Sequence, residues 1–123
     1  MKNLISIVFL LLSIHGYSQS QRFEYDSINL NNNGVWLPRD IGMKSVIILE
    51  ERAIRNYTGD TRLFYTIVQR FSKEEINLEE KLNLIIAALV LDEENKEYII
   101  IITDQFTSIT DVANQMTFQY TKN

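Results

Sequence analysis

Carboxylates are the side chains through which this chain is best equipped for chemistry. They stand in adjacent pairs or runs at Glu50–Glu51, Glu74–Glu75, Glu79–Glu80 and Asp92–Glu94. A glycosidase needs two carboxylates about 5 to 9.5 Å apart across a sugar, whereas adjacent residues of a strand point to opposite faces of the sheet. The pairs therefore favour solvated turns and a helix start over an acid–base pair.

Histidine and cysteine, which serve most nucleophilic and metal chemistry, are almost missing. The chain has no cysteine and one histidine, His15. Thiol catalysis, Ser-His catalysis and typical zinc sites need these residues. The acidic run from 92 to 97 offers oxygen ligands for calcium, but it lacks EF-hand spacing and a loop glycine, so it is interpreted as a hairpin tip. The sequence predicts a protein that is not an enzyme and has no cofactor or metal.

The first 20 residues predict where in the cell the protein is directed. Lys2 precedes an apolar segment from Leu4 to Ile14, followed by small and polar residues. A basic start, about 7 to 15 apolar residues and a small-residue exit are typical of a signal peptide, whereas a spanning helix needs about 20 apolar residues. We expect a signal peptide over 1–20, with cleavage after Ser18 or Ser20, and an exported protein, periplasmic or extracellular. An uncleaved N-terminal anchor or a buried helix is the alternative.

The remaining residues, 21–123, predict one small domain held together by packing alone. Without Lys2 the processed chain carries 11 basic residues against 16 acidic ones, a net charge of −5. An acidic chain without a Lys/Arg cluster is not suited to nucleic acid. No apolar segment within 21–123 is long enough to span a membrane, so no membrane span is expected in the processed chain.

Most of this domain shows β-type patterns separated by turn residues. Residues 22–34 begin polar and end in an Asn/Gly loop, which indicates an N-terminal arm. Strands are predicted near 46–49, 53–58 and 63–71, then at 98–103 and 116–120. Thr58-Gly59-Asp60-Thr61 is typical of a hairpin turn, and residues 104–111 are interpreted as a polar connection. The fold class expected is mainly β, a single antiparallel meander of five to six strands that forms a curled sheet or small barrel.

Residues 72–91 fit two structures. Ser72 and Glu75 have capping-box spacing, and acidic residues follow, which predicts a short helix near residues 73–81. The apolar run from 82 to 91 suits either a buried helix or a buried strand. A polar turn at 92–97 before the strand at 98–103 favours a strand over 84–91, with helix through Leu91 as the alternative.

The order of these patterns resembles the small exported β-meander proteins of Bacteroidetes, some of which are lipocalin-like barrels. The resemblance rests on the succession Val46–Leu49, Tyr57-Thr58, Tyr65-Thr66-Ile67, Ala88–Asp92, Tyr98–Ile101 and Met116–Tyr120, and on the cleavage region Ser18-Gln19-Ser20. Such proteins are mostly of unknown function. The resemblance implies the fold and the exported address, and it implies no catalytic residue.

Aromatic side chains are the candidate ligand-binding residues, because sites in barrels of this kind lie at the mouth. They either line a pocket or fill the core; the candidates are Trp36, Tyr57, Tyr65, Phe106 and Tyr120. Asp26-Ser27-Ile28 is similar to the acceptor of Bacteroidetes O-glycosylation, which makes Ser27 a candidate modification site.

Two functions from different classes remain. The first is a non-catalytic binding module for a small apolar ligand or peptide. The second is an interaction or accessory protein that docks an envelope or secreted partner, including an inhibitor-type role, through an exposed sheet face or the 104–111 connection. Both need the same alternating pattern, so the residues alone do not separate them.

Overall fold

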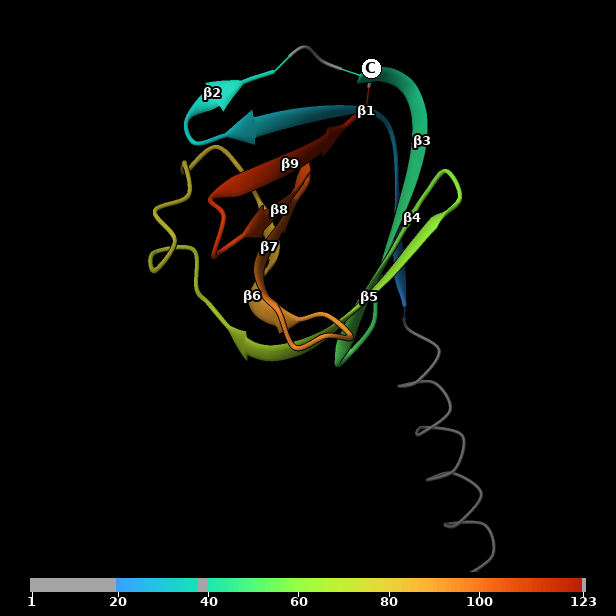
Figure 1. Cartoon of the computed structure of the whole chain (residues 1–123). Coiled ribbons are helices and arrows are strands. Elements are labelled where there is room, and N and C mark those ends of the chain that lie inside the picture. Colours follow the sequence, from blue (N-terminus) through green and yellow to red (C-terminus); the bar gives the residue numbers. More distant parts are fainter. Residues whose placement is uncertain (1–19, 38–39, 123) are drawn as a thin grey trace, which may run out of the picture.

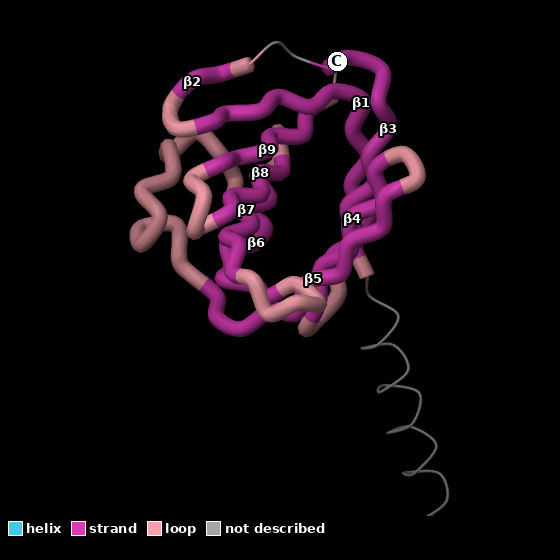
Figure 2. The backbone as a smooth tube through the Cα atoms, in the orientation of Figure 1, coloured by secondary structure: helices cyan, strands magenta, loops and turns pink. Residues whose placement is uncertain are grey.

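The chain forms a closed antiparallel β-barrel (Figure 1). The computed structural model describes residues 20–37 and 40–122; residues 1–19 of the predicted signal peptide lie outside the described residues. The described part contains nine strands and no helix (Figure 2). The strands are β1 (Gln21–Asn32), β2 (Val35–Trp36), β3 (Asp40–Leu49), β4 (Ala53–Thr58), β5 (Thr61–Arg70), β6 (Leu84–Leu91), β7 (Glu97–Thr103), β8 (Thr107–Asp111) and β9 (Met116–Thr121).

Eight of these strands make the barrel wall, and β1 closes it. Each strand from β3 to β9 pairs antiparallel with the next one in sequence. The first half of β1 pairs with β3, and its second half pairs with β9 from Ser27 to Asn32. The two-residue strand β2 is an addition that pairs with the end of β1. Closure removes most of the sheet edges that a small isoleucine-rich β protein would expose.

Strand β1 changes direction at the point where its pairing passes from β3 to β9. The register between β1 and β3 shifts between Tyr25 and Ser27, opposite the segment between Ser45 and Ile41 of β3. Gly42 lies in that segment with φ +95, a conformation that an L side chain adopts only with strain. In Figure 1 the blue half of β1 runs along β3, and the strand then turns across the barrel toward β9.

Side chains fill the barrel interior. The core cluster comprises Tyr25, Ile47, Ile54, Tyr65, Ile86, Ala88, Val90, Ile100, Ile102, Ile109 and Tyr120. Two polar contacts cross it: Asn56 Nδ2 on β4 donates to Tyr120 Oη on β9 at 3.1 Å, and the Tyr25 and Thr107 hydroxyls lie 2.6 Å apart. Because these contacts join distant strands of the wall, the middle of the barrel is packed rather than hollow.

The mainly β, antiparallel class is confirmed, but the predicted number of strands is wrong. The structure adds three strands: the two-residue β2, β1, which was interpreted as a polar arm, and β8, which was interpreted as part of a polar connection. β1 and β8 carry polar residues because those residues face solvent or hydrogen-bond inside the barrel, as Thr107 does. The curled-sheet alternative is replaced by a closed barrel.

The predicted short helix over 73–81 is also wrong, although its capping pair forms. Ser72 N donates to Glu75 Oε1 at 2.9 Å, and Glu75 N donates to Ser72 Oγ at 3.3 Å. The chain then makes turns, and Asn77 takes a positive φ of 53 that ends any helical path. A single turn does not offset the cost of helix nucleation.

The prediction of a strand over 84–91 is confirmed. β6 spans Leu84–Leu91 and pairs antiparallel with β7, joining Leu91 to Glu97 and Ala88 to Ile100. The turn between them is held by Asp92 Oδ1, which accepts the backbone N–H groups of Glu94 and Lys96, both at 2.9 Å. The helical alternative through Leu91 is therefore excluded.

Candidate functional site

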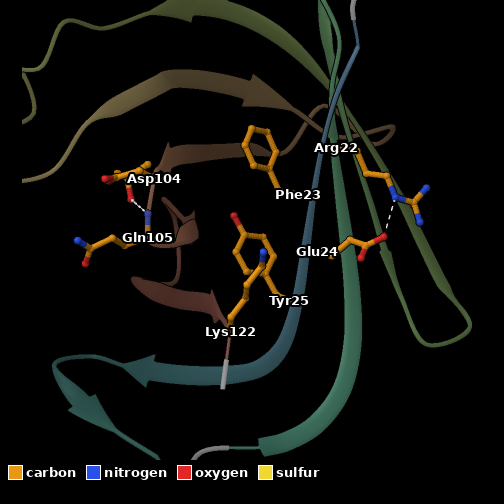
Figure 3. Close-up of a pocket in the computed structure, with 8 residues that line it drawn as sticks. Arg22, Phe23, Glu24, Tyr25, Asp104, Gln105 and Lys122 are labelled. Carbon is orange, nitrogen blue, oxygen red and sulfur yellow. Dashed lines mark hydrogen bonds and ion pairs between the residues drawn. The ribbon is translucent and has the colours of Figure 1, made fainter.

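A pocket of about 510 Å³ opens at the end of the barrel where β1 begins (Figure 3). We call it the mouth pocket. A volume of this size falls within the range of about 300 to 1,000 Å³ that small-ligand sites occupy. Its lining residues are Arg22, Phe23, Glu24, Tyr25, Thr103, Asp104, Gln105 and Lys122.

One wall of the mouth pocket is the first half of β1. Strand alternation sends Phe23 and Tyr25 toward the interior and Arg22 and Glu24 outward, as Figure 3 shows. Phe23 is half-buried and packs on the core, and Tyr25 is only 7% exposed. Arg22 Nε binds Glu24 Oε1 at 2.9 Å on the outer face. This wall therefore offers two aromatic rings inside and an ion pair outside.

The opposite wall is the turn between β7 and β8, which is held by its own hydrogen bonds. The buried Thr103 Oγ1 accepts the backbone N–H groups of Gln105 and Phe106, both at 3.1 Å. The Asp104 carboxylate accepts hydrogen bonds from Asn83, from its N at 3.1 Å and from its Nδ2 at 3.2 Å. The turn is thus fixed to the start of β6, and the Gln105 side chain is exposed at the pocket.

Charged side chains of both signs form the rim of the mouth pocket. Arg22 and Lys122 stand there with Glu24 and Asp104. A second hollow of about 520 Å³ adjoins it and shares Arg22, Glu24, Tyr25 and Lys122, with Lys44 and Asp26 added to its lining. Three cationic and three anionic side chains therefore line the two hollows together, and Arg22 is paired with Glu24.

The chemistry of the mouth pocket is suited to binding. Burial raises the pKa of the Tyr25 hydroxyl, and its hydrogen bond with Thr107 lowers that pKa by a smaller amount, so the group stays protonated and neutral at physiological pH. The pocket therefore presents aromatic surface, hydrogen-bonding groups and charged groups of both signs to a ligand. No cluster of three or more His, Cys, Asp or Glu suited to a metal occurs in 20–37 and 40–122.

The structure does not bring the five aromatic candidates together. Tyr65 and Tyr120 are buried in the core, 3% and 5% exposed. Trp36 is 54% exposed on β2, Tyr57 is half-buried on β4, and Phe106 is half-buried beside the mouth pocket in the β7–β8 turn.

Ser27, the candidate modification site, has no exposed surface in the folded barrel, and its Oγ lies 3.5 Å from Asp26 Oδ1. An enzyme can reach it only before the barrel closes. The prediction that Ser27 is modified therefore implies modification of the unfolded chain.

The residues that line the mouth pocket were not among the sequence candidates. Their signal was the alternation of Arg22, Phe23, Glu24 and Tyr25, with charged residues on one face and aromatic residues on the other. The polar composition of the following residues obscured it, and the paired residues of β1 and β9 are 84 to 94 positions apart in the sequence.

A second cluster of charged and aromatic groups lies at the other end of the barrel. Lys96 Nζ binds Asp111 Oδ2 at 2.7 Å, and Asn114 Nδ2 donates to the same oxygen at 2.8 Å. These two hydrogen bonds lower the pKa of Asp111 to about 2. Lys96 also lies over the ring of Tyr98, 5.6 Å from its centroid. Because the partners satisfy one another, this cluster fastens the β6–β7 and β8–β9 turns together.

Comparisons of the chain with protein-family models, with curated proteins and with solved structures give no match. Within the described residues, no helix has the length and apolar character needed to cross a bilayer.

Proposed function

We propose that this chain is an exported, non-catalytic binding protein whose ligand occupies the mouth pocket. The observation that carries the proposal is the composition of this pocket. Two aromatic side chains from one strand face a fixed polar turn across about 510 Å³, with Lys122 at the rim. A site with apolar walls and a few placed polar groups is the usual form of a small-ligand site.

Contacts across the barrel interior support a ligand position at the end of the barrel rather than at its centre. The contact between Asn56 and Tyr120 and the contact between Tyr25 and Thr107 occupy the middle. A ligand that enters the mouth therefore rests on the rings of Phe23 and Tyr25 and keeps its polar part at the rim. This differs from a deep calyx that encloses a wholly apolar molecule.

Export and the likeness to small exported β-meander proteins remain part of the proposal. The support is the pattern of the first 20 residues and a barrel built without cysteine. An exported carrier meets its ligand outside the cytoplasm, so the protein recovered from a cell envelope is the sample that retains it.

Native mass spectrometry of that sample tests the proposal, with a variant that fills the pocket as the matched control. Gln105→Trp adds a large side chain at an exposed position of the pocket wall and leaves the core unchanged. We expect a discrete adduct on the wild-type protein that disappears on denaturation, and at least a tenfold smaller adduct fraction on Gln105→Trp. A bare wild-type mass, or equal adducts on both proteins, would overturn the proposal.

The docking alternative is favoured by one observation at the other end of the molecule. Val35, Trp36 and Leu37 are 62%, 54% and 43% exposed in succession along and beyond the short strand β2. Aromatic and aliphatic side chains exposed in a row are typical of contact surfaces. An accessory protein that used this surface would lose its partner on Trp36→Ser, while Gln105→Trp would leave the complex intact.

A further inference from the structure

The first half of strand β5 has a strand neighbour on only one of its two sides. β4 pairs with it from Thr61 to Thr66, but β6, on its other side, pairs only from Thr66 onward. Strand β6 ends at Leu91, opposite Thr66, because the turn built on Asp92 carries the chain into β7. Among residues 20–37 and 40–122, no strand continues the line of β6 beside residues 61–65. We call residues 61–65 of β5 the free edge.

One hydrogen bond assigns the backbone groups that the free edge presents. Ile67 N donates to the carbonyl oxygen of Arg52, directly before β4, at 2.9 Å, so the backbone polar groups of Ile67 point toward β4. These groups alternate between the two sides of an antiparallel strand, so the N–H and C=O groups of Arg62 and Phe64 point away from β4. Within the described residues no strand meets them on that side. Unpaired groups of this kind are a template for another strand.

The side chains of the free edge are accessible as well. Leu63 and Tyr65 are two residues apart and therefore share one face of β5, yet Tyr65 is 3% exposed and Leu63 is 41% exposed. On the other face Arg62 is exposed and Phe64 is half-buried. In Figure 1 the β4–β5 hairpin extends outward on the right of the view. Another extended chain can therefore reach this edge.

We propose that the partner of the free edge is a second copy of this chain, whose own free edge pairs with it antiparallel around a two-fold axis. This inference goes beyond the proposed function, because the mouth pocket takes no part in it. If all five residues pair, the axis passes between the two copies of Leu63. Arg62 then faces Phe64 of the second copy, and Thr61 faces Tyr65. Arg62 and Phe64 are also the residues whose backbone groups are unpaired, so the two copies can exchange hydrogen bonds in this register.

The side chains of the free edge are complementary to themselves in this register. Leu63 opposite its counterpart buries apolar surface that is exposed in the single chain. An arginine opposite an aromatic ring makes a cation–π contact, and Phe64 already makes one within its own chain, since Arg55 Cζ lies 5.1 Å from its ring centroid. An axis at Arg62 would place two arginines directly opposite each other, which is unfavourable. An axis at Phe64 would require Thr66, which β6 already pairs.

Sedimentation velocity of the purified protein tests this inference. Interfaces this small are weak, so a dimer should form between about 10 μM and about 1 mM. Leu63→Lys places like charges opposite each other at the axis, and Arg62→Pro removes a backbone donor that the single chain does not use. Each variant should raise the dissociation constant of the dimer at least about tenfold. Val68→Lys makes the same change in charge as Leu63→Lys at a 56% exposed position of β5 outside the free edge, and its dissociation constant should stay within about twofold of the wild-type value.

Hydrogen exchange locates the contact. Dilution from dimer to monomer should speed exchange at the amides of Arg62 and Phe64 and leave residues 99–102 of β7 unchanged. A wild-type protein that stays monomeric up to about 1 mM contradicts the inference and would leave the free edge to a strand of a different protein. A dimer that neither Leu63→Lys nor Arg62→Pro weakens also contradicts it, because its interface would lie elsewhere. Assemblies larger than two copies contradict it too, since a two-fold contact closes on itself.

Discussion

The packed state of the barrel interior predicts a specific response of Tyr65 to alkaline pH. Its ring is 3% exposed and meets Tyr98 edge-on, with ring centroids 5.3 Å apart. Burial raises the pKa of its hydroxyl well above 10, chiefly by desolvation. In the unfolded chain the same hydroxyl ionises near pH 10.

The sign and size of the effect follow from this difference. Below pH 10 both states of the protein hold the proton, so the contribution to stability is fully present. Above pH 10 only the unfolded chain releases it, and the free energy of unfolding falls by about 1.4 kcal/mol per pH unit for this one group. At pH 11 the expected loss from Tyr65 is about 1.4 kcal/mol.

Tyr65→Phe keeps the ring and removes the titrating group. Urea unfolding, followed by circular dichroism, should show the wild-type protein losing about 1.4 kcal/mol more than Tyr65→Phe between pH 9 and pH 11. Between pH 6 and pH 8 the difference between the two proteins should stay constant, which serves as the control. Parallel curves up to pH 11 would refute the packed interior, because a tyrosine that lines a hydrated lumen ionises near pH 10 in both states.

Three further predictions follow from contacts in the barrel. Tyr120→Phe removes the hydroxyl that accepts the Asn56 hydrogen bond and should cost about 1 to 3 kcal/mol of unfolding free energy in urea; an unchanged midpoint would mean that this contact is absent in solution. Ile100→Ala leaves a void at a position with no exposed surface and should cost about 2 to 5 kcal/mol by the same measurement, whereas a loss under 1 kcal/mol would indicate a loose core. Because the pKa of the Asp111 carboxyl is lowered to about 2, its ionised form stabilises the fold above pH 4, and this stability is lost as the pH falls toward 2. Acid titration of Asp111→Asn should lack that loss, and an acid profile identical to that of the wild-type protein would exclude the Lys96 contact as its cause.

The elements that were predicted correctly are those whose structure is determined by the pattern of neighbouring residues. The run of apolar residues in 84–91, followed by the Asp92 turn, was enough to predict the β6–β7 hairpin, because a tight polar turn requires antiparallel partners on either side. Thr58-Gly59-Asp60-Thr61 likewise marks the β4–β5 hairpin, where Gly59 takes a φ of +55. In these hairpins the paired strands follow one another in the chain, so the local composition is enough to predict the pairing.

The pairing of strands that are far apart in the sequence could not be predicted from local residue patterns. β1 has an acidic and asparagine-rich composition because much of it faces solvent, and only its pairing with β3 and β9 makes it a strand. β8 contains Thr107 and Asp111, which are buried because Tyr25 and Lys96 satisfy them. The mouth pocket was missed for the same reason, since its walls come from residues 22–25, residues 103–105 and Lys122, which are far apart in the sequence.

Hydrogen exchange on the protein as recovered from the cells that produce it tests the central claim most directly. One half of the sample is measured as it is, and the other half after unfolding and refolding to remove any ligand. The mouth-pocket account predicts slower exchange in residues 22–25 and 103–106 of the untreated half only, with β4 and β5 the same in both. Identical exchange throughout, or a difference confined to residues 35–37, would contradict it.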